Sequence, residues 1–123
     1  MKTITELKTE TFDSTLAKAT TPVVADFYAP WCGPCKMLAP MLETLAGQFA
    51  GRAEFYKINV DEAPDLAVRY QITGVPTLLI FDQGQVRDTI VGLPSPRALA
   101  ARLETLAKES PAQPEKEQCA CCR

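Results

Sequence analysis

The sequence predicts an α/β domain built around a mixed β-sheet. Short apolar segments rich in strand-forming residues alternate along the chain with segments that carry apolar residues at helical spacing. Helices between strands act as crossovers and favour a parallel core, whereas the last two strands are close enough for an antiparallel hairpin. With 123 residues, 46% of them hydrophobic, the chain is long enough for one core and too short for two ordinary domains.

Five segments are predicted to be strands. The segment at 4–7 is expected to be a weak edge strand. The segment at 23–28 is apolar on both alternating faces, which is typical of a strand covered on both sides and predicts a central position. The last two flank Asp82-Gln83-Gly84-Gln85, a junction that predicts the hairpin. The five segments are 4–7, 23–28, 55–60, 77–81 and 86–91.

Four segments are predicted to be helices. Short ones are expected at 11–19 and 65–70. The longest opens at the cysteines discussed below, with a kink at Pro40 and Gly51 just past its end. The last has Ser95 as N-cap and Pro96 at its first position. The apolar stripes of the two longer helices are Leu38, Leu42, Leu45 and Phe49, and Leu99, Leu103 and Leu106.

The composition narrows the function. Lys and Arg total 13 against 15 Asp and Glu, which argues against a nucleic-acid partner. The absence of His removes imidazole bases and His-containing zinc sites. Five cysteines are an odd number, unlike a secreted disulfide framework, and favour a reducing compartment. No apolar run has signal-peptide or membrane-spanning length, so a cytoplasmic protein without a membrane partner is expected.

Cys32 and Cys35 lie where the central strand gives way to the longest helix. Three positions apart on a helical turn, the two thiols share one face and can close into a disulfide. The positive end of the helix is expected to lower the pKa of the more N-terminal and more exposed thiol. Cys32 is therefore the predicted nucleophile, which forms a mixed disulfide, and Cys35, shielded behind it, attacks Cys32 to release reduced substrate.

The residues around the two cysteines fit this interpretation. Gly33 lets another chain approach closely, and Pro34 has a preset helical φ where its missing N–H costs nothing. Neither offers a charge that would stabilise the thiolate, which favours a reductant over an oxidant. Trp31 is expected to line the substrate-binding surface, although a partly buried aromatic residue with no binding role would have the same sequence signature.

Two other interpretations of the pair Cys32 and Cys35 stay open. A dithiol can bind a metal, but a closed zinc site needs four ligands and the other cysteines lie more than eighty positions away. The pair could also be structural and without redox activity.

Asp26 lies in an otherwise apolar strand, six residues before Cys32. Burial is expected to raise its pKa and to make it a proton acceptor for Cys35. The alternative is a hydrogen-bonded core carboxylate with no catalytic part.

Several of these segments together resemble the thioredoxin family over a match from about Thr3 to Lys108. The segments are Asp26-Phe27-Tyr28-Ala29-Pro30-Trp31-Cys32-Gly33-Pro34-Cys35-Lys36, Lys57 with Asn59-Val60-Asp61, Gly74-Val75-Pro76-Thr77, and Gly92. The resemblance implies a thioredoxin fold, a mostly parallel core plus an antiparallel hairpin in a five-stranded sheet flanked by four helices. It also implies a general protein-disulfide reductase with no bound cofactor, which receives electrons from NADPH through a thioredoxin reductase. Its partners would be that reductase and disulfide-containing target proteins, and the chain is expected to be a monomer.

The resemblance also assigns roles to single residues. It implies that Lys57 is the partner of Asp26. It further implies that Pro76 is cis, lies against the dithiol, shapes the peptide groove and keeps metal out, with Gly74, Val75 and Gly92 beside it. The chain departs from the family at Tyr28, where many relatives carry Trp, and in its cysteine-bearing tail.

The tail is predicted to span 110–123, after a domain at 1–109. Its first residues include two prolines and no apolar side chain large enough to anchor it. Its thiols, Cys119, Cys121 and Cys122, could be incidental, could bind a soft ion such as Cu(I), or could return to Cys32 as a redox relay. A further possibility is a binding subunit that uses the dithiol face only to hold a partner protein.

Overall fold

The computed structural model describes residues 4–109, with side chains up to Leu106. Within them, the elements are β1 (Thr5–Leu7), α1 (Thr9–Lys18), β2 (Val23–Tyr28), α2 (Gly33–Gln48), β3 (Glu54–Asn59), α3 (Pro64–Arg69), β4 (Thr77–Asp82), β5 (Gln85–Val91) and α4 (Pro96–Glu109). The predicted strands and helices are confirmed, with boundaries that mostly differ by one or two residues. The domain boundary at 109/110 and the tail cysteines lie at or beyond the end of the described residues.

The five strands form one sheet in the order β1-β3-β2-β4-β5, so β2 is central and β1 is an edge strand, as predicted. β1, β3 and β2 are parallel, and β4 and β5 form the predicted antiparallel hairpin. The hairpin also pairs with the core in the antiparallel sense, through β4 and β2, with Thr77 opposite Phe27. Consequently β4 begins at the end of the sheet where β2 stops, and the loop before Thr77 lies beside the loop that leads into α2.

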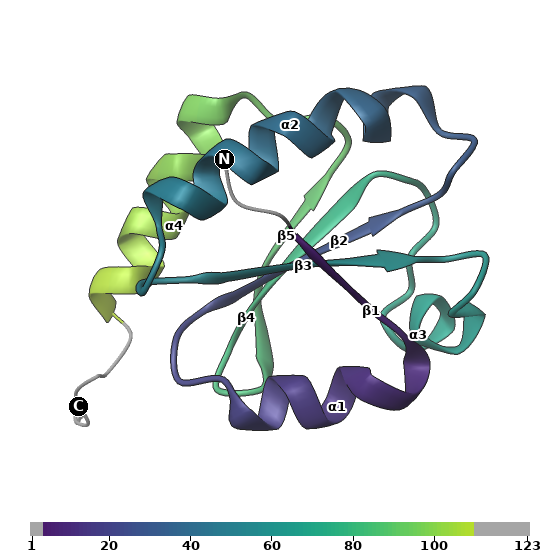
Figure 1. Cartoon of the computed structure of the whole chain (residues 1–123), viewed down its shortest axis with the longest axis horizontal. Coiled ribbons are helices and arrows are strands. Elements are labelled where there is room, and N and C mark those ends of the chain that lie inside the picture. Colours follow the sequence, from purple (N-terminus) through teal and green to yellow (C-terminus); the bar gives the residue numbers. More distant parts are fainter. Residues whose placement is uncertain (1–3, 110–123) are drawn as a thin grey trace.

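Helices cover both faces of the sheet. Figure 1 shows α2 and α4 on one side and α1 and α3 on the other. Successive side chains of β2 point to opposite faces of the sheet. Val24 packs with the leucines of α2 and α4. Ala25 and Phe27 pack on the other face, with Phe12 of α1 and Leu66 of α3. Asp26 alternates with Ala25 and Phe27, so its side chain belongs to the α2 side.

The turns follow the sequence chemistry. α2 runs through Pro40 without interruption, and Gly51 beyond its end has a φ of 83°. Gln83 and Gly84 have φ values of 57° and 82° in the two-residue turn between β4 and β5. Positive φ at both central residues is typical of a tight hairpin turn that matches the twist of the strands.

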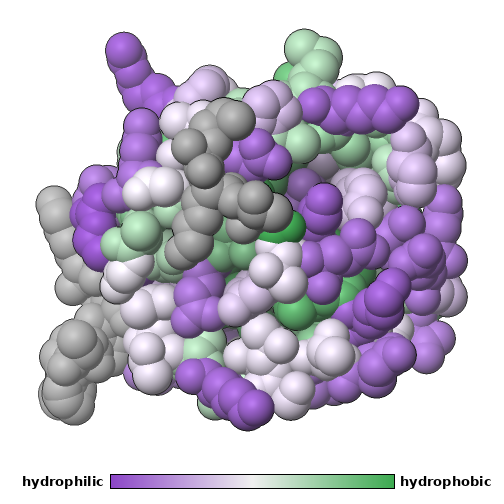
Figure 2. Space-filling view, in the orientation of Figure 1, coloured by the Kyte–Doolittle hydropathy of each residue, from purple (hydrophilic) through white to green (hydrophobic). Residues whose placement is uncertain are grey.

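The exterior is largely polar on the face shown. In Figure 2, hydrophilic residues cover much of the surface and hydrophobic residues show in smaller areas between them. None of the helices in residues 4–109 is long and apolar enough to cross a membrane.

Ser95 caps α4, as predicted, because its Oγ accepts a hydrogen bond from the Ala98 N–H at 3.1 Å. We expect Ser95→Ala to lower the free energy of unfolding by about 1 kcal/mol, since one N–H of the first turn loses its partner. Urea unfolding measures the change. The matched control is Ser14→Ala inside α1, where the hydroxyl only donates to the Thr11 carbonyl. An equal loss in both variants would contradict the capping argument.

Candidate active site

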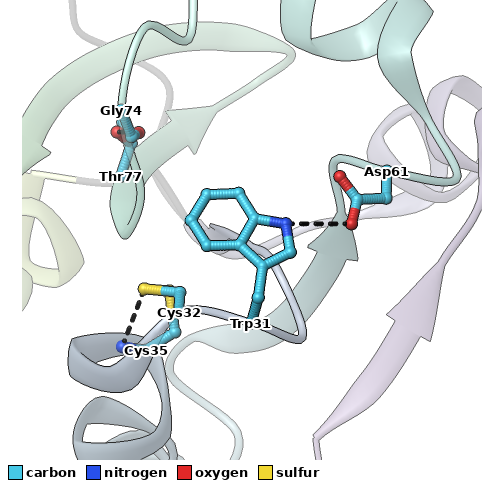
Figure 3. The surroundings of a disulfide bond; sticks show 6 residues. All are labelled: Trp31, Cys32, Cys35, Asp61, Gly74 and Thr77. Atoms are coloured by element: carbon cyan, nitrogen blue, oxygen red, sulfur yellow. Dashed lines mark hydrogen bonds between the residues drawn. A yellow bond between two sulfur atoms is a disulfide. The ribbon is translucent and has the colours of Figure 1, made fainter.

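Cys32 is the N-cap residue of α2 and Cys35 lies in its first turn, and the two form a disulfide with a Cα–Cα distance of 5.3 Å. The Cys32 Sγ accepts a hydrogen bond from the Cys35 N–H at 3.2 Å (Figure 3). Pro34 lies in the first turn of the helix, where a backbone N–H has no partner within the helix, so the missing N–H of proline costs nothing. The sulfur of Cys32 therefore lies at the positive end of the helix, in contact with one of its free amides.

The prediction that Cys32 is the more exposed of the two cysteines is wrong for this disulfide form. Both residues expose 5% of their surface. They pack in a small cluster with Ala29, and Val60 and Val75 cover it from the ends of two other segments. The two sulfurs thus differ through their positions in the helix and not through residue burial, while Gly33 and Pro34 between them are exposed.

The loop before β4 closes one side of the site. The Val75–Pro76 peptide is cis, as the resemblance implies, and Pro76 is buried. Thr77 Oγ1 donates to the Gly74 carbonyl at 2.6 Å. The Gly92 N–H donates to the Pro76 carbonyl at 2.9 Å, and its φ of 93° favours glycine. The predicted residues Gly74, Val75, Pro76 and Gly92 are therefore joined in one unit beside the disulfide.

Trp31 is 70% exposed, so a partly buried aromatic residue is the wrong description. Its Nε1–H donates to Asp61 Oδ2 at 3.2 Å, which holds the ring between the disulfide and the end of β3 (Figure 3). The indole lines a largely apolar groove of about 340 Å³ together with Gly74 and Val75. The other residues of the groove are Val60, Pro64, Ala67, Val68, Ile72 and Thr73.

Asp26 is 4% exposed, and its Oδ1 has no hydrogen-bond partner among the described residues. Burial raises the pKa of its carboxyl from 3.8 to about 7, and the positive charge of Lys57 opposes this only in part.

A second cavity, of about 210 Å³, lies behind the disulfide and brings together Asp26, Cys35 and Lys57. Lys57 is the direct neighbour of Asp26 on β3, and its Nζ lies 5.8 Å from the centre of the Tyr28 ring. Tyr28, which also lines the cavity, donates its hydroxyl hydrogen to Glu6 Oε1 at 2.9 Å. Asp26, its predicted partner Lys57 and the predicted resolving residue Cys35 therefore share one pocket.

The sequence reasoning missed several residues of the site. Val60 and Asp61 follow directly on β3, and the groove extends onto α3. A signal was available for the first two, because Val60 and Asp61 belong to Asn59-Val60-Asp61, one of the segments that carry the family resemblance. Within residues 4–109 no group of three or more potential ligands could hold a metal ion.

Comparisons with known proteins find relatives that match most of this chain. The family profile described as Thioredoxin matches residues 3–105. Thioredoxin M2, chloroplastic, of Arabidopsis thaliana is 46% identical over 94 residues, which are 76% of this chain and 50% of that protein. Thioredoxin of Acidithiobacillus ferridurans is 44% identical over 96 residues, 78% of this chain and 89% of that protein. The solved structure of a mutant thioredoxin from Halobacterium salinarum NRC-1 has a TM-score of 0.78 and 41% identity, covering 84% of this chain and 89% of that one.

The length of the relatives differs. This chain spans about half the length of the chloroplastic proteins that it matches and most of the length of the bacterial ones.

Proposed function

This chain belongs to the thioredoxin family, and we propose on that premise that it is a protein-disulfide reductase that works through reversible oxidation of Cys32 and Cys35. The observation that carries the proposal is the disulfide at the N-terminal end of α2, beside a groove able to hold a peptide. Thiol–disulfide exchange needs a sulfur that is stable as an anion and a second thiol within reach of it.

In the first step the reduced protein attacks its target. The helix end and the Cys35 N–H stabilise the anionic Sγ of Cys32. This sulfur attacks one sulfur of the target disulfide, the target S–S bond breaks, and the other target sulfur leaves as a thiolate that takes a proton from solvent. The product is a mixed disulfide between Cys32 and the target.

In the second step Cys35 resolves the mixed disulfide. Its thiol gives a proton to the carboxylate of Asp26, which lines the same cavity, and its Sγ then attacks the Cys32 sulfur. The bond between Cys32 and the target breaks, the target leaves with its second reduced sulfur, and the site disulfide closes. Two electrons pass to the target. Lys57 serves as a positioning residue, because its positive charge lowers the free-energy cost of ionising the buried Asp26.

The target segment binds over the exposed side of the site. Gly33 and Pro34 leave room above the sulfurs, and Trp31, Gly74 and Val75 supply apolar contact. Pro76 and Gly92 support this surface from below through their hydrogen bond. This surface offers apolar side chains together with backbone groups, so it suits extended target segments of varied sequence.

The cycle closes when a reductase reduces the site disulfide. We assign this role to a thioredoxin reductase that draws on NADPH, with no cofactor held by the chain itself. We further propose a monomer that acts without nucleic acid or a membrane. A cytoplasmic location accords with the odd cysteine count, and the chloroplastic names of several relatives point to another compartment as the alternative.

The experiment that tests the function is trapping with Cys35→Ser, in a chain whose tail cysteines are also serine. We expect this variant to retain targets from a cell extract as mixed disulfides that dithiothreitol releases, because the resolving thiol is missing. The control is the variant with both Cys32 and Cys35 replaced by serine, which should retain none. Equal, dithiothreitol-insensitive retention by both variants would instead identify a binding subunit and refute the reductase.

A further inference from the structure

We propose that Glu6 and Tyr28 are positioning residues for the transfer of a proton to Asp26. Their hydrogen bond keeps the ammonium group of Lys57 on the side of Asp26, where its charge favours the ionised carboxylate that accepts the proton of Cys35. The inference rests on the proposed function and extends it to two residues to which the mechanism assigns no part.

One row of charged side chains crosses the three parallel strands. Glu6 of β1 lies opposite Lys57 of β3 in the register of the sheet, and Lys57 lies opposite Asp26 of β2. Side chains in register on neighbouring strands point to the same face of the sheet, and such strands are about 4.8 Å apart. The ammonium group of Lys57 therefore has a carboxylate on either side, and the two carboxylates compete for it.

Tyr28 contacts both sides of this competition. It lies two residues beyond Asp26 on β2 and so points to the same face of the sheet. Its hydroxyl donates to Glu6 Oε1 at 2.9 Å, and Lys57 Nζ lies 5.8 Å from the centre of its ring, within the range of a cation–π contact. Asp26, Tyr28 and Lys57 line the cavity of about 210 Å³ behind the disulfide, whereas Glu6 does not line it. Tyr28 thus engages the competing carboxylate with its hydroxyl and the ammonium group with its ring.

The hydroxyl of Tyr28 remains a donor throughout the physiological pH range. Burial and the hydrogen bond with Glu6 raise the pKa of Tyr28 to about 12. A neutral donor stabilises the carboxylate of Glu6 without contributing a charge. The charge of Lys57 is then left to act on Asp26, where it opposes the rise in pKa that burial causes.

Other groups around Asp26 are the same in every variant of the test below. Lys36 of α2 lines the same cavity. Glu62, which follows β3, forms an ion pair with Lys8 at 3.0 Å. The neighbour of Asp26 on β4 is the apolar Leu78. A change in the titration of Asp26 therefore reports on the substituted residues.

The titration of Asp26 tests the proposal. NMR follows the carboxyl carbon of Asp26 against pH in the oxidised chain, labelled with ¹³C in its aspartates. Tyr28→Phe keeps the ring and removes the hydroxyl, so Glu6 draws Lys57 away from Asp26. We expect the pKa of Asp26 to rise by about 0.5 from its value of about 7. An unchanged pKa in this variant, with its fold verified by circular dichroism, would overturn the proposal.

A matched control removes the same kind of hydrogen bond from the other face of the sheet. Tyr56 donates to Glu54 Oε1 at 2.6 Å and packs with the core cluster on the side of α1. Tyr56→Phe should leave the titration of Asp26 unchanged. A rise as large as that in Tyr28→Phe would show that loss of any such hydroxyl suffices, and would overturn the proposal.

Two backgrounds test the route of the effect. Glu6→Gln has no competing charge and Lys57→Met has no ammonium group, so adding Tyr28→Phe to either should not raise the pKa of Asp26. A full rise in either background would overturn the proposal, because the hydroxyl would then act on Asp26 by another route. Should Tyr28→Phe fail to fold, Glu6→Gln alone tests the same competition at a partly exposed edge strand. It should lower the pKa of Asp26, and an unchanged or higher pKa would overturn the proposal.

Release of the target connects the titration to the reaction. In single turnovers at saturating target concentration, Tyr28→Phe should release reduced target about 2-fold more slowly than the wild type at pH 7, because less of Asp26 is ionised to accept the proton of Cys35. The difference should vanish well above the pKa of Asp26, and a difference that is independent of pH would overturn the proposal. A wild type that reduces no insulin disulfides would refute the proposed function and this role with it. Normal reduction of insulin with an unmoved pKa of Asp26 in Tyr28→Phe would refute the positioning role alone.

Discussion

Cys32→Ser is expected to lower the rate of insulin reduction by on the order of 10³-fold or more, with dithiothreitol as electron donor. The serine hydroxyl is not ionised at neutral pH, so the helix end that stabilises the Cys32 sulfur has no anion to offer to the target disulfide. The disulfide of the site cannot form either. Insulin precipitation follows the rate directly.

The control for Cys32→Ser is the chain with serine at 119, 121 and 122. With dithiothreitol in excess, this variant should keep the full rate, because the external thiol regenerates the site at every turnover. Near-normal insulin reduction by Cys32→Ser, with its fold verified by circular dichroism, would show that Cys32 is not the nucleophile.

Asp26→Asn is expected to stabilise the oxidised protein above pH 7 by up to about 4 kcal/mol. The pKa of Asp26 rises from 3.8 in the unfolded chain to about 7 in the folded one, chiefly through burial. Each pKa unit corresponds to about 1.36 kcal/mol. A raised carboxyl pKa means that the folded state binds the proton more tightly, so the wild type loses stability as pH rises from about 4 to about 7. The amide has no such proton to lose.

Urea unfolding of the oxidised wild type and of Asp26→Asn between pH 5 and pH 8.5 measures this difference. The gap between the two proteins should widen with pH and level off above about 7. The same variant should release reduced target more slowly, by about 10²-fold, because Cys35 has no nearby acceptor for its proton. A gap that stays constant across the pH range would contradict the raised pKa of Asp26.

The local elements were predictable from the sequence because their signals are local. Alternating apolar residues indicated β2, the stripe of leucines indicated α2, and Ser95 with Pro96 indicated the start of α4. The antiparallel pairing of β4 with β2 was not foreseen, since periodicity tells which faces are covered and not which strand lies beside which.

The site was predictable only in part, for the same reason. The sequence places Cys32, Cys35 and Asp26 within ten residues of one another, so a helix junction and a buried strand suffice to bring them together. The cluster around the two cysteines includes Val60 and Val75, which come from segments distant in the sequence. The hydrogen bond between Trp31 and Asp61 spans thirty positions and depends on the register of β2 and β3.

The reactivity of the Cys32 sulfur in the fully reduced protein tests the central claim most directly. Iodoacetamide is added at pH 7 to the reduced chain, folded or unfolded in urea, and mass spectrometry follows the alkylation of each cysteine. A thiolate stabilised at the end of α2 should make Cys32 react about 5-fold to 10-fold faster in the folded protein than in the unfolded one, while Cys35 reacts more slowly. Alkylation of Cys32 that is no faster in the folded chain would contradict the account.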